Sequence, residues 1–148
     1  MKILFICHGN ICRSTMAEFV LKDLAAKKGL DWEIQSAATS TEELGNDIHR
    51  GTKAKLTEKG IPFTSRRARL MTKADYDYHD LLIGMDRYNM INMRRFYAND
   101  PQGKLRLLLD YTSRGGDIAD PWYTGNFDET FDDVLEGCNA LIEKVLER

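Results

Sequence analysis

The chain is poor in cysteine, and its few cysteines do not suit a disulfide framework. It has three, an odd number, and two of them, Cys7 and Cys12, lie within one short segment. Secreted domains held together by disulfides usually carry an even set of spaced cysteines. We therefore expect reduced thiols and a cytoplasmic protein.

Long apolar runs and an excess of charge of one sign are also missing. The N-terminal apolar run, residues 3–6, is far shorter than a signal-peptide core, and no stretch approaches the roughly 20 apolar residues of a membrane-spanning helix. The formal net charge is only -2. Neither a membrane nor a nucleic acid is an expected partner.

The chain does contain enough apolar residues for one hydrophobic core, and they are arranged in alternating strand and helix patterns. With 148 residues, 43% of them hydrophobic, the chain has the length of one domain, and we expect it to span 1–148. Strands are predicted at residues 3–6, 32–38, 81–83 and 105–109. The alternation predicts an α/β domain built around a parallel sheet.

Helix signals lie between the predicted strands. The first helix starts at Ser14, or at Thr15 paired with Glu18 in a capping box, and Gly29 closes it. A basic helix is predicted at 49–59, a helix capped by Asp86 runs to about 96, and a long apolar helical face follows residue 126. Residues 39–46 and 112–126 are predicted loops.

The segment CHGNICRST, residues 7–15, follows the first predicted strand directly. Parallel sheets bind ligands beyond the carboxyl ends of their strands, and the start of the next helix leaves backbone N–H groups free for an anion. Five residues separate Cys7 from Arg13, enough for the loop to wrap a tetrahedral oxyanion with the thiol beneath it and the guanidinium at its rim. The same positive field favours the thiolate, so Cys7 is predicted to be an activated nucleophile.

Each part of this pattern also has an ordinary structural explanation. A cysteine that ends a buried strand is usually a small apolar side chain, and Gly-Asn is a common turn. The conjunction of Cys7, the short loop, Arg13 and a helix start favours a functional site. A zinc site using Cys7, His8 and Cys12 is a weaker alternative, because no second ligand pair accompanies it.

A thiolate that displaces an alkoxide or phenoxide from phosphorus needs an acid to protonate the leaving group. The segment DIADPWYTGNF offers Asp117 and Asp120, with Trp122 and Tyr123 as candidate walls of an apolar mouth. Pro121 biases Asp120 toward an extended backbone. An ordinary Asp-Pro loop with a core tryptophan is an equally good explanation from spacing alone.

Three motifs together, CHGNICRS, MDRYN and DPWY, resemble the low-molecular-weight protein tyrosine phosphatases over essentially the whole chain. The resemblance implies a three-layer flavodoxin-like fold, with a central four-stranded parallel sheet of order 2-1-3-4 and helices on both faces. It implies hydrolysis of phosphotyrosine in proteins or peptides through a cysteinyl-phosphate intermediate, without a metal or cofactor. Inorganic phosphate or other oxyanions would also bind the loop. We expect a monomer and leave a weak dimer open.

The resemblance also assigns roles to residues of this chain. Cys7 would be the nucleophile, Arg13 the phosphate clamp and Asp120 the general acid, later the base for water. Ser14 would assist the thiolate as leaving group, and Cys12 would trap an oxidised Cys7 as a reversible disulfide. The expected substrate-binding residues are His8, Gly9, Asn10, Ile11, Cys12, Ser14, Trp122 and Tyr123.

The chain departs from the family pattern at two places. Many members carry an aromatic residue on the loop after the second strand, where this sequence places Glu42 or Glu43, so the rim is predicted to be acidic and to repel acidic phosphopeptides. Members often link the loop asparagine, here Asn10, to a serine and a histidine. Ser36 matches the serine, but the histidine position reads as Arg66. The cluster Arg66, Arg67 and Arg69 is either an attractor of phosphorylated partners or a solvated charged face.

Three other functions stay open from the sequence. A protein-arginine phosphatase of the same fold typically has threonine where this chain has Ile11. An arsenate reductase would need two more cysteines for its relay, and only Cys138 follows the loop. A phosphocysteine carrier would store phosphate without hydrolysing it, which Arg13 and Asp120 argue against.

Overall fold

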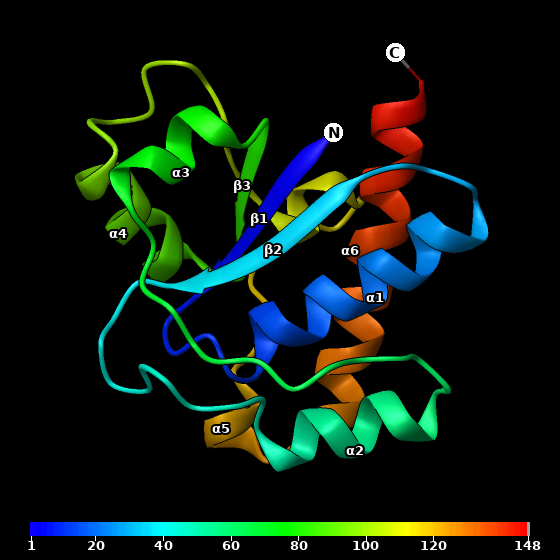
Figure 1. The fold of residues 1–148 in the computed structure, drawn as a ribbon. Helices are drawn as coiled ribbons and strands as arrows, with labels where there is room; N and C mark the ends of the chain where they lie inside the picture. The colour runs from blue at the N-terminus through cyan, green and yellow to red at the C-terminus, as the bar shows by residue number, and fades with distance from the viewer. Residues whose placement is uncertain (148) are drawn as a thin grey trace.

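A computed structural model describes residues 1–147 and shows strands and helices in alternation (Figure 1). In chain order the elements are β1 (Lys2–Cys7), α1 (Arg13–Lys27), β2 (Glu33–Ala38), α2 (Arg50–Glu58), α3 (Lys73–Tyr78), β3 (Leu81–Gly84), α4 (Arg87–Phe96), β4 (Leu105–Leu107), the 3-10 helix η1 (Leu108–Tyr111), α5 (Pro121–Thr124) and α6 (Phe127–Leu146).

The strands form one parallel sheet in the order β2-β1-β3-β4, which confirms the expected fold class and strand order. β1 is central and pairs with β2 on one side and β3 on the other, as its continuous apolar run predicts. Ile3 and Phe5 belong to the core on one face of the sheet, whereas Leu4 and Ile6 belong to the core on the other. Complete burial of a side chain such as Phe5 stabilises the fold by about 1.5–3 kcal/mol.

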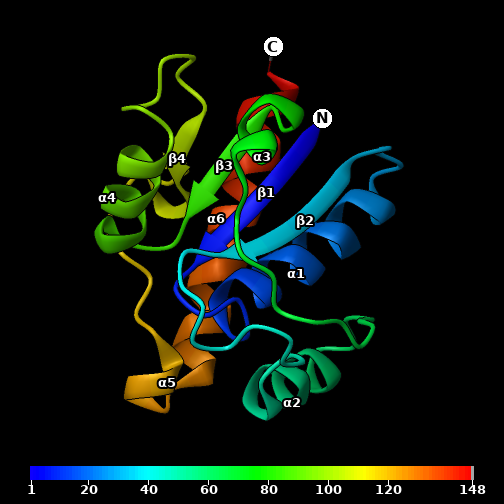
Figure 2. The same ribbon diagram turned by 60° about the vertical axis from the view of Figure 1, so that its left-hand side comes forward.

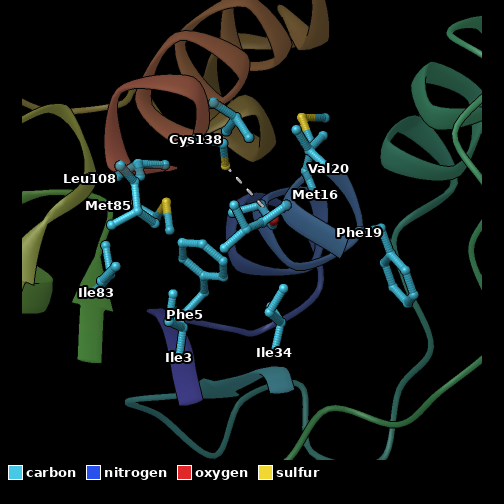
Figure 3. Packing of buried hydrophobic residues seen from close by; sticks show 14 of the residues in the cluster. Ile3, Phe5, Met16, Phe19, Val20, Ile34, Ile83, Met85, Leu108 and Cys138 are labelled. Atoms are coloured by element: carbon cyan, nitrogen blue, oxygen red, sulfur yellow. Dashed lines mark hydrogen bonds between the residues drawn. The ribbon is translucent and has the colours of Figure 1, made fainter. Parts of the chain in front are cut away.

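Helices cover both faces of the sheet and make three layers. α1 and α6 pack on one face, and α3 and α4 lie over the other, as both ribbon views show (Figures 1 and 2). Figure 3 shows the core under α1 and α6, where Phe5, Met16 and Leu108 meet Cys138. None of the helices in residues 1–147 is both long enough and apolar enough to cross a bilayer.

The carboxyl ends of the strands meet at one end of the sheet, and α2 and α5 lie beyond that end (Figure 2). β2 and β3 flank β1 on opposite sides, so the chain reverses its direction of winding next to β1. Such a switch point leaves a crevice above the strand ends. The segment after Cys7 lies there.

The structure corrects several predicted boundaries. α1 begins at Arg13 behind Cys12, with no side-chain cap, so both predicted caps are wrong. Ser14 lies within the helix and its hydroxyl contacts Asn10 and Cys7, while Glu18 bonds Ser36, so neither side chain caps the helix. The fourth strand is three residues long and passes into η1, and the predicted loop 112–126 contains the short helix α5. The sequence analysis predicted no helix at the position of α3.

Candidate active site

Five carbonyl groups of residues 7–12, the loop after β1, accept hydrogen bonds from groups outside the loop. The bonds run from Thr39 N to Cys7 O, Ser40 N to His8 O, Arg66 Nη1 to Asn10 O, His49 N to Ile11 O and Met16 N to Cys12 O, at 2.8–3.1 Å. In a trans peptide the N–H points opposite to the C=O, and residues 1–147 contain no cis peptide. The N–H groups of residues 8, 9, 11, 12 and 13 are therefore directed into the loop, where they form an anion cradle.

Two residues let the loop turn this tightly. Asn10 has a φ of 59°, a left-handed conformation that asparagine tolerates better than most residues. Gly9 lies under the side chain of Glu43, and a Cβ built on Gly9 would come within 3.2 Å of Glu43 Cγ. A larger residue at position 9 would therefore push the loop and the segment after β2 apart.

Cys7 lies at the floor of this cradle. Its side chain is 3% exposed, and its Sγ is 3.0 Å from Ser14 Oγ and 3.3 Å from the backbone N of Asn10. Both neighbours can donate a hydrogen bond to sulfur. Such donors stabilise the charged form of a thiol more than the neutral form.

Arg13, on the first turn of α1, is held from behind. Its Nη1 donates to Asp86 Oδ2 at 2.7 Å and to Ile118 O at 2.9 Å, and its Nη2 lies 3.4 Å from Asp120 Oδ2. Burial opposes the charge of Arg13, but the negative charges of Cys7, Asp86 and Asp120 raise its pKa. Its Nε is buried without a partner among the described residues. The Nε and Nη2 edge is thus suited to a bidentate oxyanion.

Asp120 and the aromatic residues after it stand on α5. The Asp120 carboxylate accepts a bond from Trp122 N at 3.0 Å and so caps α5, with Pro121 at its first position. Trp122 is 55% exposed and Tyr123 82% exposed, so the alternative of a core tryptophan is wrong. The Trp122 ring meets His49 edge to face at 5.5 Å, which steadies this wall.

These elements enclose a cavity of about 90 Å³. Of the predicted site residues it is lined by Cys7, His8, Gly9, Ile11, Cys12, Arg13, Asp120, Trp122 and Tyr123. Asn10, Ser14 and Ser36 are not among the lining residues, and all three are buried. Asn10 and Ser14 are hydrogen-bonded to each other, whereas Ser36 bonds Glu18 and Arg66. Asp117, the other candidate acid, instead accepts a bond from Arg87 N at 3.0 Å.

The wall opposite α5 is acidic. Glu42 and Glu43 both line the cavity, where the sequence predicted one of them. Glu42 pairs with His8 Nε2 at 2.9 Å, and Glu43 accepts a bond from Asn46 Nδ2 at 2.6 Å. The cavity therefore has aromatic side chains on one side and carboxylates on the other.

Cys12 shares the cavity with Cys7 but differs in its chemistry. Burial raises the pKa of Cys12 to about 12, with further contributions from the negative charges of Cys7 and Asp120. Its thiol is therefore neutral at neutral pH. Among residues 1–147 no three His, Cys, Asp or Glu side chains are grouped so that they could hold a metal ion.

Sequence reasoning placed Arg66 at the histidine position of the family pattern, but it did not predict the contacts by which Asp86, Arg66 and Arg69 support the loop. Asp86 was predicted only as a helix cap, and it caps α4, yet its other oxygen also holds Arg13. Arg66 bonds Asn10 and Ser36, and Arg69 pairs with Asp75 at 2.9 and 3.0 Å. Arg66 and Arg69, two of the three clustered arginines, are therefore bound within the fold. Neither the prediction of an attractor for phosphorylated partners nor that of a solvated charged face describes these two residues. Asp86 lies 73 positions from Arg13, and Arg66 lies 56 positions from Asn10, so spacing within a motif gave no signal for these two contacts.

Comparison with known proteins gives a consistent result. The model of the family described as low molecular weight phosphotyrosine protein phosphatase matches residues 2–148. The chain is 39% identical over 149 residues to the low molecular weight protein-tyrosine-phosphatase YfkJ of Bacillus subtilis, covering 98% of this chain and 96% of that protein. It is 33% identical to PtpA of Staphylococcus aureus, covering 98% and 94%.

Solved structures agree. The crystal structure of YfkJ from Bacillus subtilis superposes with a TM-score of 0.96 at 38% identity, covering 99% of this chain and 95% of that one. A Drosophila arginine phosphatase superposes with a TM-score of 0.90 at 27% identity, covering 98% of both chains.

Proposed function

This chain belongs to the low molecular weight phosphotyrosine protein phosphatase family, and we propose that it hydrolyses phosphotyrosine with Cys7 as nucleophile, Arg13 as phosphate clamp and Asp120 as proton donor. As a member it is a phosphoric monoester hydrolase. The observation that carries the residue roles is the loop itself. Its carbonyl groups are bonded to segments outside the loop, its N–H groups are directed inward, and Cys7, Arg13 and Asp120 line the same cavity.

In the first step the Cys7 thiolate attacks phosphorus, and the bond to the tyrosine oxygen breaks. The proton held by Asp120 passes to the departing phenolate, which leaves as neutral tyrosine. The inward N–H groups and the Nε and Nη2 atoms of Arg13 bind the phosphoryl oxygens, whose charge they stabilise best in the transition state.

In the second step water attacks the phosphorus of the cysteinyl phosphate. Asp120, now a carboxylate, takes the water proton, and the Cys7 thiolate departs while inorganic phosphate forms. The Ser14 hydroxyl at 3.0 Å from Sγ can donate to the sulfur as charge returns to it. One site thus performs both steps.

The shape of the cavity supports an aromatic leaving group. Trp122 and Tyr123 form a wall against which a tyrosine ring can pack, and Ile11 places an apolar side chain at the cavity where an arginine phosphatase typically has threonine. Phosphotyrosine proteins are the expected substrates. The monomeric state, the cytoplasmic location and the lack of nucleic-acid and membrane partners stay predictions from the sequence.

Turnover of p-nitrophenyl phosphate across pH 4 to 8 with excess EDTA tests this function. We expect metal-independent release of p-nitrophenol, and we expect Cys7→Ser to lower kcat by roughly 10⁴-fold or more, because the nucleophile is lost. Phosphotyrosine and phosphoarginine peptides are then compared. Turnover that survives Cys7→Ser would refute the nucleophile, and faster turnover of phosphoarginine would reassign the substrate.

We also propose that Cys12 protects Cys7 from irreversible oxidation. Peroxide converts the Cys7 thiolate to a sulfenic acid and releases hydroxide. The Cys12 thiol then attacks the sulfenic sulfur, which forms a disulfide and releases water. The shared cavity and the neutral state of Cys12 support this order of events, since the thiolate reacts first.

A further inference from the structure

Arg66 reaches the loop from the extended segment between α2 and α3. Its Nη1 donates to Asn10 O at 2.8 Å, its Nη2 donates to Asn10 Oδ1, and the same Nη2 lies 3.3 Å from Ser36 Oγ. The backbone N of Arg69 donates to the same Asn10 Oδ1 at 3.3 Å. One guanidinium therefore contacts both the backbone and the side chain of the residue with the left-handed conformation.

The donors and acceptors in this cluster can be assigned without ambiguity on the Ser36 side. A guanidinium donates hydrogen bonds and cannot accept them. Ser36 has one hydroxyl hydrogen, which goes to the carboxylate of Glu18 at 2.5 Å. The Ser36 oxygen is then an acceptor for Arg66. Glu18 is in turn paired with Lys22 at 2.6 Å, so the chain of bonds ends at a second cation.

The orientation of the Asn10 side-chain amide follows in the same way. Because Arg66 Nη2 and Arg69 N are both donors, the atom of the Asn10 amide that faces them must be the oxygen. The amide nitrogen then faces Ser14 Oγ at 2.8 Å and donates to it. With its oxygen accepting from Asn10, Ser14 has its hydrogen left for the Cys7 sulfur at 3.0 Å.

We propose that Arg66 is a positioning residue of the phosphoryl site: by fixing the orientation of the Asn10 amide it makes Ser14 donate to the Cys7 sulfur, and it adds a permanent positive charge to the surroundings of the thiolate. The proposal builds on the proposed function of Cys7. A histidine, which the family often has at this position, donates or accepts according to its tautomer. An arginine cannot reverse the direction of the bonds.

Electrostatics agrees with the geometry. Burial lowers the pKa of Arg66, while the negative charges of Glu18, Cys7 and Asp47 oppose that shift. An arginine keeps its proton throughout the range in which proteins fold, so the charge is present at every working pH. The anion cradle thus has Arg13 inside the cavity and Arg66 behind it, on opposite sides of the loop backbone.

The test separates charge from donor geometry with three variants. Arg66→Lys keeps the charge but loses the fork, Arg66→Gln keeps one donor but loses the charge, and Arg67→Gln removes the same charge from the exposed neighbouring residue as a matched control. Each is assayed for the pH dependence of Cys7 alkylation by iodoacetamide, for inhibition by inorganic phosphate, and for kcat and KM. Melting temperatures report folding. Alkylation reports on Cys7 and not on Cys12, because the Cys12 thiol has a pKa of about 12 and stays in its unreactive neutral form.

We expect Arg66→Gln to alkylate roughly tenfold more slowly than the wild type near pH 6, because the variant lacks both the positive charge and the guanidinium that orients Asn10. Arg66→Lys should alkylate within about twofold of the wild type but bind phosphate roughly tenfold more weakly, because a single ammonium nitrogen cannot replace the two-nitrogen fork that holds Asn10. Arg67→Gln should match the wild type within about twofold in both assays.

Equal alkylation by Arg66→Gln, Arg67→Gln and the wild type would overturn the proposal. So would a lower melting temperature with unchanged alkylation and phosphate binding, since Arg66 would then be merely structural. Equally slow alkylation by Arg66→Lys and Arg66→Gln would overturn the role of the charge. Alkylation requires no turnover, so failure of the wild type to hydrolyse phosphate esters would refute the proposed function separately.

Discussion

Cys7 and Cys138 are both buried in the core under α1 and α6, yet their surroundings differ. Cys7 is 3% exposed and Cys138 is 0% exposed. The Cys7 sulfur has the Ser14 hydroxyl at 3.0 Å and the Asn10 N–H at 3.3 Å. The Cys138 sulfur points to α1 and meets Ala17 O, an acceptor, at 3.9 Å (Figure 3). Burial raises the pKa of Cys138 well above its usual range.

Burial therefore does not distinguish the two cysteines, whereas hydrogen-bond donors do. At the carboxyl end of β1 the fold places polar groups whose orientations are fixed by the surrounding segments. Around Cys138, under the helices, it places apolar side chains whose burial away from water stabilises the fold. We expect substitutions at the strand end to reduce activity with little loss of stability, and substitutions around Cys138 to do the reverse.

After Cys7→Ser, the largest effect should come from Asp120→Asn. Asparagine can still cap α5, so the fold is kept, but it cannot donate the proton to the leaving group. We expect kcat for phosphotyrosine peptides to fall roughly 10²- to 10³-fold, with loss of the basic limb of the pH profile. Steady-state kinetics from pH 4 to 8 measures both, with Asp117→Asn as the matched control. A similar loss in Asp117→Asn would mean that the acid is misassigned.

Gly137→Ala tests the other region. A Cβ at Gly137 would lie 2.5 Å from Leu108 Cγ, inside the core. Overpacking costs about 1–3 kcal/mol, and the better helix propensity of alanine offsets part of that, so we expect a net loss of about 1–2 kcal/mol in the free energy of unfolding. Urea titration measures this, with Asn139→Ala on the exposed face of α6 as the control. A drop in kcat at 25 °C in place of lost stability would break the comparison.

Recovery from peroxide compares the three cysteines directly. The wild type and Cys138→Ala should regain most of their activity in dithiothreitol after brief peroxide treatment, because the Cys7 to Cys12 disulfide is reducible. Cys12→Ser should regain clearly less, since Cys7 then oxidises further. Equal recovery in Cys12→Ser, or no recovery in the wild type, would contradict the protective role.

The smallest effect is expected at the acidic rim. Glu42→Gln and Glu43→Gln should each improve kcat/KM for phosphotyrosine peptides with acidic flanks by about 2- to 5-fold relative to neutral peptides, because exposed charges contribute little. The gain should shrink at high salt. Asp31→Asn, which removes the same charge ahead of the amino end of β2, is the control. An equal gain in Asp31→Asn would show that net charge is responsible, with no special role for the rim.

The sequence predicts this molecule best where local patterns decide the structure. The apolar run of residues 3–6 correctly predicted that β1 is a central strand, and Asp86 was correctly predicted to cap α4. The start of α1 was predicted wrongly because Ser14 bonds Asn10 of the preceding loop and Glu18 bonds Ser36 of β2. Asp120 and Pro121 are the N-cap and the first residue of α5, so this pair could have predicted the short helix, which the sequence analysis treated as loop.

The role of Arg66 was beyond local reasoning for a different reason. It acts on Asn10, which lies 56 positions earlier in the chain. The two meet only because the segment between α2 and α3 runs along the carboxyl end of the sheet. Spacing within a motif can suggest a nucleophile and a clamp, but it cannot show which distant side chain orients them.

The most direct test of the central claim is to trap the covalent intermediate. Wild-type protein turning over a phosphotyrosine peptide is quenched rapidly in acid, digested and analysed by mass spectrometry, with Cys7→Ser as the control. We expect one phosphoryl group on the peptide that contains Cys7, and none in the control. A phosphoryl group on any other residue, or steady turnover with an unmodified Cys7 at every quench time, would contradict it.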